Sequence, residues 1–574
     1  MQIEERKFSP STALALAKAG IPPLLARVFA ARGIRRYEDV IGPLEELHPY
    51  TRLKGCAELA VVLADAILEN KRLVIIADYD ADGATACSVG LRALRAFGAN
   101  VGSLIPRRLE DGYGLTPEIA DMAAQLDPKP DFLITVDNGI ASHAGIMKCN
   151  FLGMPVLVTD HHLPADGLPP PDARIIVNPN QHGCNFPSKA LAGVGVIWYV
   201  MMALQDEMNR RGIGPMQDDF DVRDLLPIVA LGTVADVVAL DRNNRILVTE
   251  GLRRSHQGRS FPGMDALAKA AKRNPRSLTT GDIGFGIGPR INAAGRLATM
   301  DAGVECLTTE SIARAEALAT ELSDLNEQRK SIESGVVDAA VDQLINELGV
   351  EGRYTIVLHG DQWHEGVIGI VAGRVRERTY RPTFILASNH LGQMKGSGRS
   401  IPGFHLRDAL DMVAKRNPNL LVKFGGHAAA AGLTLRAGAL AEFQELFEEV
   451  AKEMLTPATL SQVMETDGAL DVSEMTLDTV ADIKTQVWGQ AFPEPTFSDE
   501  FRVLEYRKLG DKGQHLRMTL EKGGKKFVAM KFRHEDGEVP PRIRAVFKLD
   551  ANTFRNETTL QMLVDYFEPV ELAA

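Results

Sequence analysis

Residues 73–83, LVIIADYDADG, combine an apolar run with a cluster of carboxylates that follows it directly. A run of about five apolar residues between polar turns is typical of a parallel strand buried on both faces. Similar runs occur at 132–136 (FLITV), 155–159 (PVLVT) and 174–177 (RIIV), with helical patterns between them. The sequence therefore predicts an α/β fold with an open parallel sheet between about residues 58 and 240.

Three of the predicted strands end in an aspartate, at Asp78, Asp137 and Asp160. In open sheets of this class, ligands bind beyond the carboxyl ends of the strands. A fourth carboxylate, Asp236, interrupts the apolar stretch GTVADV, where a charge is costly unless it is paired or binds a cation. We expect four strand-end segments to bring these side chains to one site.

The DYDADG motif places carboxylates at every second position, at Asp78, Asp80 and Asp82. Like charges this close raise one another's pKa, and a hard divalent cation removes the conflict. Taken alone, the motif is equally consistent with a calcium-loop turn or a helix-capping turn. Its place after a buried strand, without the glutamate of an EF-hand, favours a metal centre at the end of a strand.

Asp160 is followed by His161 and His162, and adjacent histidines in a loop point in different directions. One imidazole can therefore bind a metal while the other faces a bound phosphate. Carboxylates and imidazoles without thiolates are the ligands of Mn²⁺ or Mg²⁺ rather than of structural zinc. Two such ions suit phosphoester hydrolysis, because they activate water and neutralise the charge of the transition state.

Composition limits the class of protein. With 574 residues, 45% of them hydrophobic, the chain is expected to form several globular domains. We expect a cytoplasmic protein without membrane contact, because apolar runs are short and the first residues are acidic. The formal charge of −11 gives no support to a nucleic-acid partner by itself. The five cysteines, which lack a CxxC pair and are expected to be buried and reduced, are Cys56, Cys87, Cys149, Cys184 and Cys306.

The hydrophobic pattern of the sequence changes twice in the second half of the chain. Residues 309–348 keep an apolar helical period without proline and stop at Gly349, which predicts a long connecting helix. Residues 355–388 then predict a second strand-helix-strand unit. After about residue 457, apolar and polar residues alternate in five short stretches, which predicts a small antiparallel barrel.

At these motifs the sequence resembles the DHH phosphoesterase superfamily, which is named for the triplet seen here at Asp160, His161 and His162. The order DYDADG, VDNG, TDHH, GTVAD, GSGRS and FGGHAAAAG, followed by a barrel, is similar to that of the bacterial single-strand-specific 5′→3′ DNA exonucleases of this superfamily. The resemblance implies a DHH phosphoesterase domain with an N-terminal helical extension at 1–308, a connecting helix at 309–350, a DHHA1-type α/β domain at 351–456 and an OB-fold barrel domain at 457–574.

The resemblance also implies the roles of individual residues. The implied ligands of two Mn²⁺ or Mg²⁺ ions are Asp78, Asp80, Asp82, Asp137, His161 and Asp236. Asp137 would bridge the two ions. Asp78 stands where many members have a histidine, so direct ligation by Asp78 is left open. Asp160 would orient its neighbour, and His162 would contact the scissile phosphate.

The remaining implied roles are substrate contacts, since arginines and small residues suit a phosphate backbone. Two groups are Arg107, Arg108 and Tyr113 in a short polar loop, and Arg290, Asn292 and Arg296 in the loop GPRINAAGR, for which an ordinary surface loop is the alternative. The group expected to hold the terminal nucleotide and its 5′ phosphate is Ser397, Arg399, Gly425, Gly426 and His427. For Asp361, Trp363, His364 and Glu365, packing of the turn and a direct role are equally open.

The activity expected from this resemblance is hydrolysis of single-stranded DNA from its 5′ end, with release of 5′-mononucleotides, in DNA repair and recombination. A single-strand-binding protein and a helicase are candidate partners, and a monomer is the default state. Two other hypotheses remain: a DHH phosphodiesterase for short oligonucleotides or cyclic dinucleotides, and a non-catalytic nucleic-acid-binding scaffold. The expected barrel argues against the first, and the intact motifs argue against the second.

Overall fold

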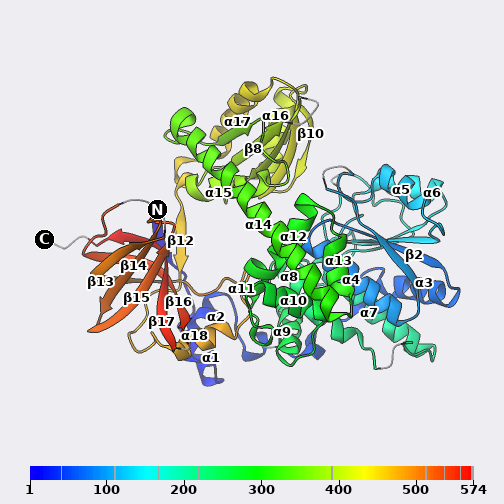
Figure 1. The fold of residues 1–574 in the computed structure, drawn as a ribbon, viewed down its shortest axis with the longest axis horizontal. Helices are drawn as coiled ribbons and strands as arrows, with labels where there is room; N and C mark the ends of the chain where they lie inside the picture. The colour runs from blue at the N-terminus through cyan, green and yellow to red at the C-terminus, as the bar shows by residue number, and fades with distance from the viewer. Residues whose placement is uncertain are drawn as a thin grey trace.

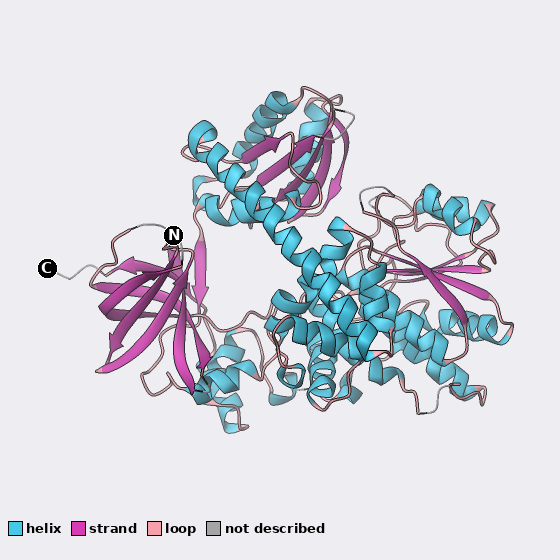
Figure 2. Cartoon of the chain, viewed as in Figure 1, coloured by secondary structure: helices cyan, strands magenta, loops and turns pink. Residues whose placement is uncertain are grey.

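The computed structural model describes residues 1–40, 42–108, 111–165, 167–216, 219–388, 392–510, 513–534, 537–555 and 557–570. The strands gather mainly in three groups, which a largely helical central region connects (Figure 2). In Figure 1 the first sheet and the barrel lie at opposite ends, and a second sheet lobe lies at the top of the view. No helix in the described ranges is long and apolar enough to cross a membrane.

The first sheet has five parallel strands in the order β3-β2-β4-β5-β6. These strands are β2 (Arg72–Ala77), β3 (Asn100–Leu104), β4 (Phe132–Val136), β5 (Val156–Thr159) and β6 (Ile175–Val177). Side chains of β2 enter two separate cores, with Leu73 and Ile75 on one face and Val74 and Ile76 on the other. Burial on both faces explains the uninterrupted apolar run, and the predicted parallel sheet is confirmed.

Strand β3 was not predicted from the sequence. Its sequence, NVGSL, lies at the edge of the sheet and is only partly buried. An edge strand with a solvent-facing side needs few apolar residues, so no apolar run marks it.

Helices cover both faces of the sheet and continue into a bundle (Figure 1). The helices around the sheet are α3 (Cys56–Leu68), α4 (Ala81–Ala96), α5 (Pro117–Ala124), α6 (His143–Phe151) and α7 (Gly193–Arg210). The bundle contains α8 (Leu226–Ala235), α9 (Arg242–His256), α10 (Pro262–Ala270), α11 (Thr280–Asp282), α12 (Gly288–Leu297) and α13 (Asp301–Thr308). A π-helical turn, Ile283–Ile287, joins α11 to α12.

The predicted connecting helix is confirmed as α14 (Ile312–Gln343), which ends in a π-helical turn at Leu344–Leu348. It packs against α10 and α12 at one end and against α15 (Ile368–Thr379) of the second lobe at the other. The second lobe contains β7 (Ile356–Gly360), β8 (Thr383–Ser388), β9 (Met394–Arg399), α16 (Leu406–Arg416), β10 (Leu421–Gly426), β11 (Ala430–Leu435) and α17 (Leu440–Met454). Its sheet order is β10-β11-β9-β8-β7, and only β7 and β8, the predicted strand-helix-strand unit, pair in parallel.

The C-terminal strands form a closed barrel in the order β13-β14-β15-β17-β16. They are β13 (Phe497–Leu509), β14 (His515–Lys522), β15 (Lys525–Phe532), β16 (Arg542–Phe554) and β17 (Glu557–Pro569), and α18 (Leu477–Lys484) precedes them. The barrel is confirmed, but the expectation of purely antiparallel pairing is wrong, because β15 and β17 are parallel. A closed barrel with an odd number of strands requires at least one parallel pair.

The N-terminal segment, with α1 (Pro10–Lys18) and α2 (Pro23–Ala31), joins the C-terminal region. Strand β1 (Gln2–Glu5) pairs in parallel with β12 (Val463–Thr466). Arg32 and Asp467 form a buried ion pair at 2.7 Å, and the Phe29 ring stacks on Trp488 with centroids 5.7 Å apart. The N-terminal extension, which was assigned to the first domain, therefore packs against the C-terminal domain.

Candidate metal centre and adjoining cavity

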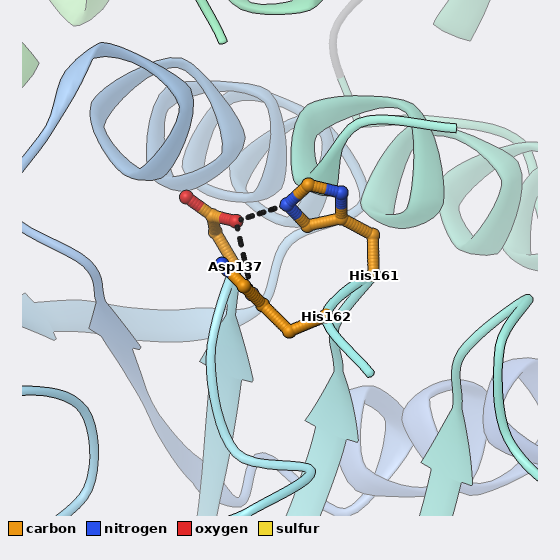
Figure 3. Close-up of side chains that lie close together, drawn as sticks. All are labelled: Asp137, His161 and His162. Atoms are coloured by element: carbon orange, nitrogen blue, oxygen red, sulfur yellow. Dashed lines mark ion pairs between the residues drawn. The ribbon is translucent and has the colours of Figure 1, made fainter. Parts of the chain in front are cut away.

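Three predicted site residues meet because their strands are neighbours in the sheet. Strands β2, β4 and β5 are hydrogen-bonded to one another in parallel, so their carboxyl ends lie at one edge. Asp78, Asp137 and Asp160 follow these three ends directly. Figure 3 shows Asp137 facing the two histidines that follow Asp160.

His161 lies at the centre of the cluster. Its Nε2 atom is 3.1 Å from Oδ1 of Asp137, 3.6 Å from Oδ2 of Asp236 and 3.9 Å from Oδ2 of Asp82. Three groups have ligand atoms that all lie within 4.8 Å of one another: Asp137, His161 and His162; Asp82, His161 and Asp236; and Asp78, Asp80 and Asp137. Every residue predicted as a metal ligand is therefore part of this cluster, and Asp137 belongs to two of the groups.

Backbone N–H groups fix the acidic loop in place. Oδ1 of Asp80 accepts hydrogen bonds from the amides of Asp82 and Gly83 at 2.9 and 3.0 Å, so Asp80 caps helix α4. The carboxylate of Asp82 accepts from the amides of Gly193 and Val194 at the start of α7. The helix-capping alternative therefore holds for Asp80, but the same carboxylate also lies in the cluster.

Burial and mutual repulsion oppose the simultaneous ionisation of the carboxylates in the cluster. Burial, followed by the charge of neighbouring aspartates, raises the pKa of Asp78, Asp137 and Asp236 well above the ordinary value. The same causes raise the pKa of Asp82 to about 7. A bound cation would remove the repulsion, which is the usual reason for such a grouping.

The cluster has a further feature that suits a metal. Burial, and then the charge of His162, lower the pKa of His161 to about 4, so its imidazole is neutral. Nε2 of His161 and Oδ1 of Asp137 face each other, are buried, and have no hydrogen-bond partner within the described residues. A neutral imidazole nitrogen and a carboxylate oxygen without a donor, grouped with further carboxylates, are ligands that Mn²⁺ or Mg²⁺ accepts, so the residues fit the expected ions.

Asp160 acts on the second histidine. Its Oδ1 atom is 2.8 Å from Nδ1 of His162 and accepts from the backbone amide of His161 at 2.7 Å. It was expected to orient its neighbour, and the ring it holds is that of His162. Burial lowers the pKa of His162, but the hydrogen bond and charge of Asp160 outweigh burial and raise it to about 9. The hydroxyl of Tyr113 lies 3.3 Å from Nε2 of the same ring, so Asp160, His162 and Tyr113 form a row of polar contacts beside the cluster.

Asp236 reaches the cluster from a helix, which corrects the expectation of four strand-end segments. It is the C-terminal cap of α8, an apolar helix buried along most of its length. The apolar stretch GTVADV gave no indication of strand or helix, because both are equally apolar when buried.

The motif GPRINAAGR is also a helix, α12, and not the predicted loop. At about 100° per residue, positions 290 and 296 point to different sides of a helix. Arg290 points away from the cluster and bonds to Ser323 Oγ, Gly286 O and Ala270 O. It is therefore held within the bundle, contrary to the expected substrate contact.

The other two residues predicted from this motif approach the site. Oδ1 of Asn292 accepts a hydrogen bond of 2.9 Å from the amide of Ala81, which lies between two cluster aspartates. Asn292 therefore positions the acidic loop. Arg296 is directed at the second lobe, where its Nη1 atom donates to Gly366 O at 3.0 Å.

A cavity of about 380 Å³ lies between the two lobes, next to the cluster. Residues of both lobes line it: Tyr79, Arg108, Arg296, Glu365, Gly366, Ile368, Gly369, Lys395, Gly396, Ser397, Arg399, Lys423, Phe424, Gly425, Gly432, Leu433 and Thr434. Cations dominate this lining, and the carboxylate of Glu365 is 2.8 Å from Lys395. Burial, and then the charges of Arg108, Arg329 and Arg399, lower the pKa of Arg296 to about 10.

The lining includes some predicted substrate contacts and omits others. Arg108, Ser397, Arg399 and Gly425 line the cavity together with Arg296. Four predicted contacts lie outside this lining. The backbone amide of Arg107 donates to Asp111, and Tyr113 lies at His162. Gly426 ends β10, and His427 begins the turn to β11. Lys395 and Lys423 also line the cavity and were not predicted, because a lysine at a strand position is ordinarily a solvated residue.

The fold and this site together define a metal-dependent phosphoesterase of the DHH class. Three protein-family models match the chain: the "DHH family, N-terminal domain" at 72–233, the "DHHA1 domain" at 352–453 and the "RecJ OB domain" at 466–566. The sequence is 42% identical to "Single-stranded-DNA-specific exonuclease RecJ" of Escherichia coli (strain K12), over 96% of this chain and 97% of that protein. The chain belongs to the RecJ family of single-stranded-DNA-specific exonucleases.

Other relatives agree with this family. RecJ of Bacillus subtilis (strain 168) is 33% identical over 95% of this chain and 68% of that protein. The crystal structure of RecJ in complex with Mn²⁺ from Thermus thermophilus is similar with a TM-score of 0.83 and 29% identity, over 100% of this chain and 80% of that chain. A structure of the same RecJ with Mg²⁺ has a TM-score of 0.77. The expected fold class, enzyme class and metal requirement are confirmed.

Proposed function

We propose that this chain removes 5′-mononucleotides from single-stranded DNA, beginning at the 5′ end. The main support is the position of the cationic cavity directly beside the metal cluster. Tyr79 lines the cavity, while its chain neighbours Asp78 and Asp80 belong to the cluster. An anionic group held in the cavity therefore places the next phosphodiester at the carboxylates.

In this proposal Asp80, Asp82, Asp137, His161 and Asp236 hold two divalent ions. Mn²⁺ or Mg²⁺ supplies an activated water and neutralises the charge that develops on the phosphate during hydrolysis. The protein contributes fixed geometry, because backbone amides hold Asp80 and Asp82 before any substrate arrives. Asp78 is close enough to ligate directly, since its carboxylate belongs to one of the three groups.

His162 contacts the scissile phosphate as a cation. Its raised pKa keeps the imidazole protonated near neutral pH, and the Asp160 carboxylate fixes the ring through Nδ1. Nε2 can then donate a charge-assisted hydrogen bond to a phosphate oxygen. The hydroxyl of Tyr113, which is half exposed, lies 3.3 Å from Nε2 of the same ring and can contact the same phosphate.

The cavity binds the terminal nucleotide. Arg296 and Arg399 supply charge for the 5′ phosphate, and Ser397 supplies a hydroxyl beside them. The two lobes approach to hydrogen-bond distance where Arg296 donates to Gly366. A DNA strand that enters here must therefore be single-stranded. Selectivity for single strands follows from this narrow passage.

The cellular setting is also part of the proposal. Each of the five cysteines is a buried free thiol, as suits a protein of the reducing cytoplasm. The cluster and the cavity are complete within one chain, which supports action as a monomer. A helicase that opens duplex DNA and a single-strand-binding protein that keeps it open would supply the substrate.

One experiment tests the function. Single strands labelled at the 5′ or the 3′ end are incubated with the protein and Mn²⁺, beside duplex DNA of the same sequence. Early release of labelled mononucleotide only from the 5′-labelled single strand is the expected result. Release from the 3′ end first, or equal attack on duplex, would contradict the proposal.

The rival activity, hydrolysis of short oligonucleotides or cyclic dinucleotides, shares the same cluster. The barrel and its fixed connection to the N-terminal segment favour a long strand, because they extend the surface well beyond a dinucleotide (Figure 1). A higher efficiency on dinucleotides than on long strands would favour the rival.

A further inference from the structure

Phe285 is 92% exposed, in a turn that packs against α8, the helix that ends at the cluster residue Asp236. It sits in the π-helical turn Ile283–Ile287, a geometry that occurs mostly as single turns and frequently at functional sites. An aromatic ring left in water at such a place is a candidate for contact with a ligand.

The backbone on either side of Phe285 is held closely, so the ring projects outward. A Cβ atom added to Gly284 would lie 3.6 Å from Cγ1 of Val234, and one added to Gly286 would lie 3.5 Å from Cβ of Ala271. The two glycines thus pack against α8 and the end of α10. Phe285, between them, is directed to solvent.

A second exposed apolar side chain lies just after the end of α8. Val237 follows the cluster residue Asp236, is 62% exposed and has a φ of 62°, which is rare for a β-branched residue. Its amide donates to the carbonyl of Val234, the residue that Gly284 packs against. We call Val234, Val237 and Phe285 the apolar ledge. Lys272, exposed and next to Ala271, adds a positive charge at its border.

The ledge and the cavity lie at opposite ends of α12. At its start, a Cβ atom added to Gly288 would lie 3.2 Å from Cβ of Ala235, beside the ledge. At its end, Arg296 lines the cavity, and between them Asn292 bonds to the acidic loop. With a rise of about 1.5 Å per residue, the two ends are about 12 Å apart, and the cluster lies between them.

We propose that Phe285 stacks on a nucleobase of the substrate strand, on the 3′ side of the scissile bond. The inference rests on the proposed function, because a strand that has its 5′ end in the cavity and follows α12 past the cluster reaches the ledge at the other end of the helix. An aromatic ring with a neighbouring cation is the usual means of binding single strands without sequence preference. The ring thereby favours long strands over dinucleotides, which end before the ledge.

The test compares catalytic efficiency on a long 5′-phosphorylated single strand with that on a 5′-phosphorylated dinucleotide, in the presence of Mn²⁺. For Phe285→Ala we expect the ratio of the two efficiencies to fall about tenfold, the loss of one base stack. Phe285→Trp, which keeps an aromatic face, should restore the ratio. The matched control is Phe151→Ala, which removes a ring that is 84% exposed on α6, away from the site.

The outcomes separate this inference from the function on which it rests. A wild-type ratio in Phe285→Ala, or an equal loss on both substrates, would overturn the stacking contact while the exonuclease activity stands. Loss of the ratio in Phe151→Ala as well would overturn it too. A wild-type protein inactive on single-stranded DNA would reject the proposed function and this inference together.

Discussion

The metal cluster and the neighbouring cavity collect charges of opposite sign. In the cluster, carboxylates such as Asp82 and Asp137 are buried together, and their pKa values are raised. In the cavity, arginines such as Arg296 and Arg399 are buried together, and their pKa values are lowered. Repulsion between the buried like charges destabilises each region until an ion of opposite charge binds. That ion is a metal cation in the cluster and a phosphate in the cavity. The burial of like charges in each region therefore favours the binding of an ion of opposite charge.

Breaking the anionic region should have the largest effect. We expect Asp137→Ala to lower the rate of mononucleotide release by about 10³-fold, because this carboxylate belongs to two of the three ligand groups. Rates with Mn²⁺ and bound metal per protein are the measurements. The matched control, Asp324→Ala, removes an exposed carboxylate on α14. A near-normal rate with unchanged metal content would show that the cluster is not the catalytic centre.

Breaking the cationic region should cost less. We expect Arg399→Ala to reduce efficiency on 5′-phosphorylated strands by about 10- to 100-fold, the loss of one or two charged hydrogen bonds. The preference for a 5′ phosphate over a 5′ hydroxyl should disappear as well.

The control for this change is Arg290→Ala, on the side of α12 away from the cavity. Its three hydrogen bonds are within the bundle, so we expect a lower melting temperature and an unchanged 5′-phosphate preference. If both arginine variants lose the preference equally, the cavity is not the phosphate site.

A change at Asn292, which lies between the two regions, should have a smaller effect still. Asn292→Ala removes the acceptor that holds the amide of Ala81, so the acidic loop becomes less well ordered. We expect the Mn²⁺ concentration for half-maximal activity to rise about tenfold, with full activity recovered at high Mn²⁺. Activity that added metal fails to restore would assign Asn292 a different role.

The smallest effect concerns stability without metal. The pKa of Asp82 is raised from 3.8 to about 7 in the folded chain, so its proton stabilises the fold. This contribution is complete below about pH 4 and is lost as the pH rises through 7.

We therefore expect the melting temperature of the metal-free protein to fall by about 5 °C between pH 5 and pH 8. Saturating Mn²⁺ should remove most of this dependence, because the ion replaces the proton. Thermal unfolding in chelator and in Mn²⁺ measures both. Identical pH profiles in the two conditions would show that the carboxylates do not face one another as described.

The acidic cluster was largely predictable from sequence. Asp78, Asp137 and Asp160 each follow an apolar run, and parallel strands end at one edge of a sheet. Asp236 was identified by its apolar surroundings, although the element that presents it was not. The cavity was less predictable, because Lys395 and Lys423 resemble surface residues until the second lobe packs against α12.

The parallel sheet, the connecting helix, the barrel and the residue types of the metal site could all be predicted from the sequence, because they follow from local periodicity and from chain order. Two features depend on long-range packing: Arg296 reaches the cavity while Arg290 does not, and β1 pairs with β12. Arg290 and Arg296 differ because side chains at different positions of a helix point to different sides of its axis. The partner of each side depends on packing between segments far apart in the chain. A local sequence pattern does not predict this packing.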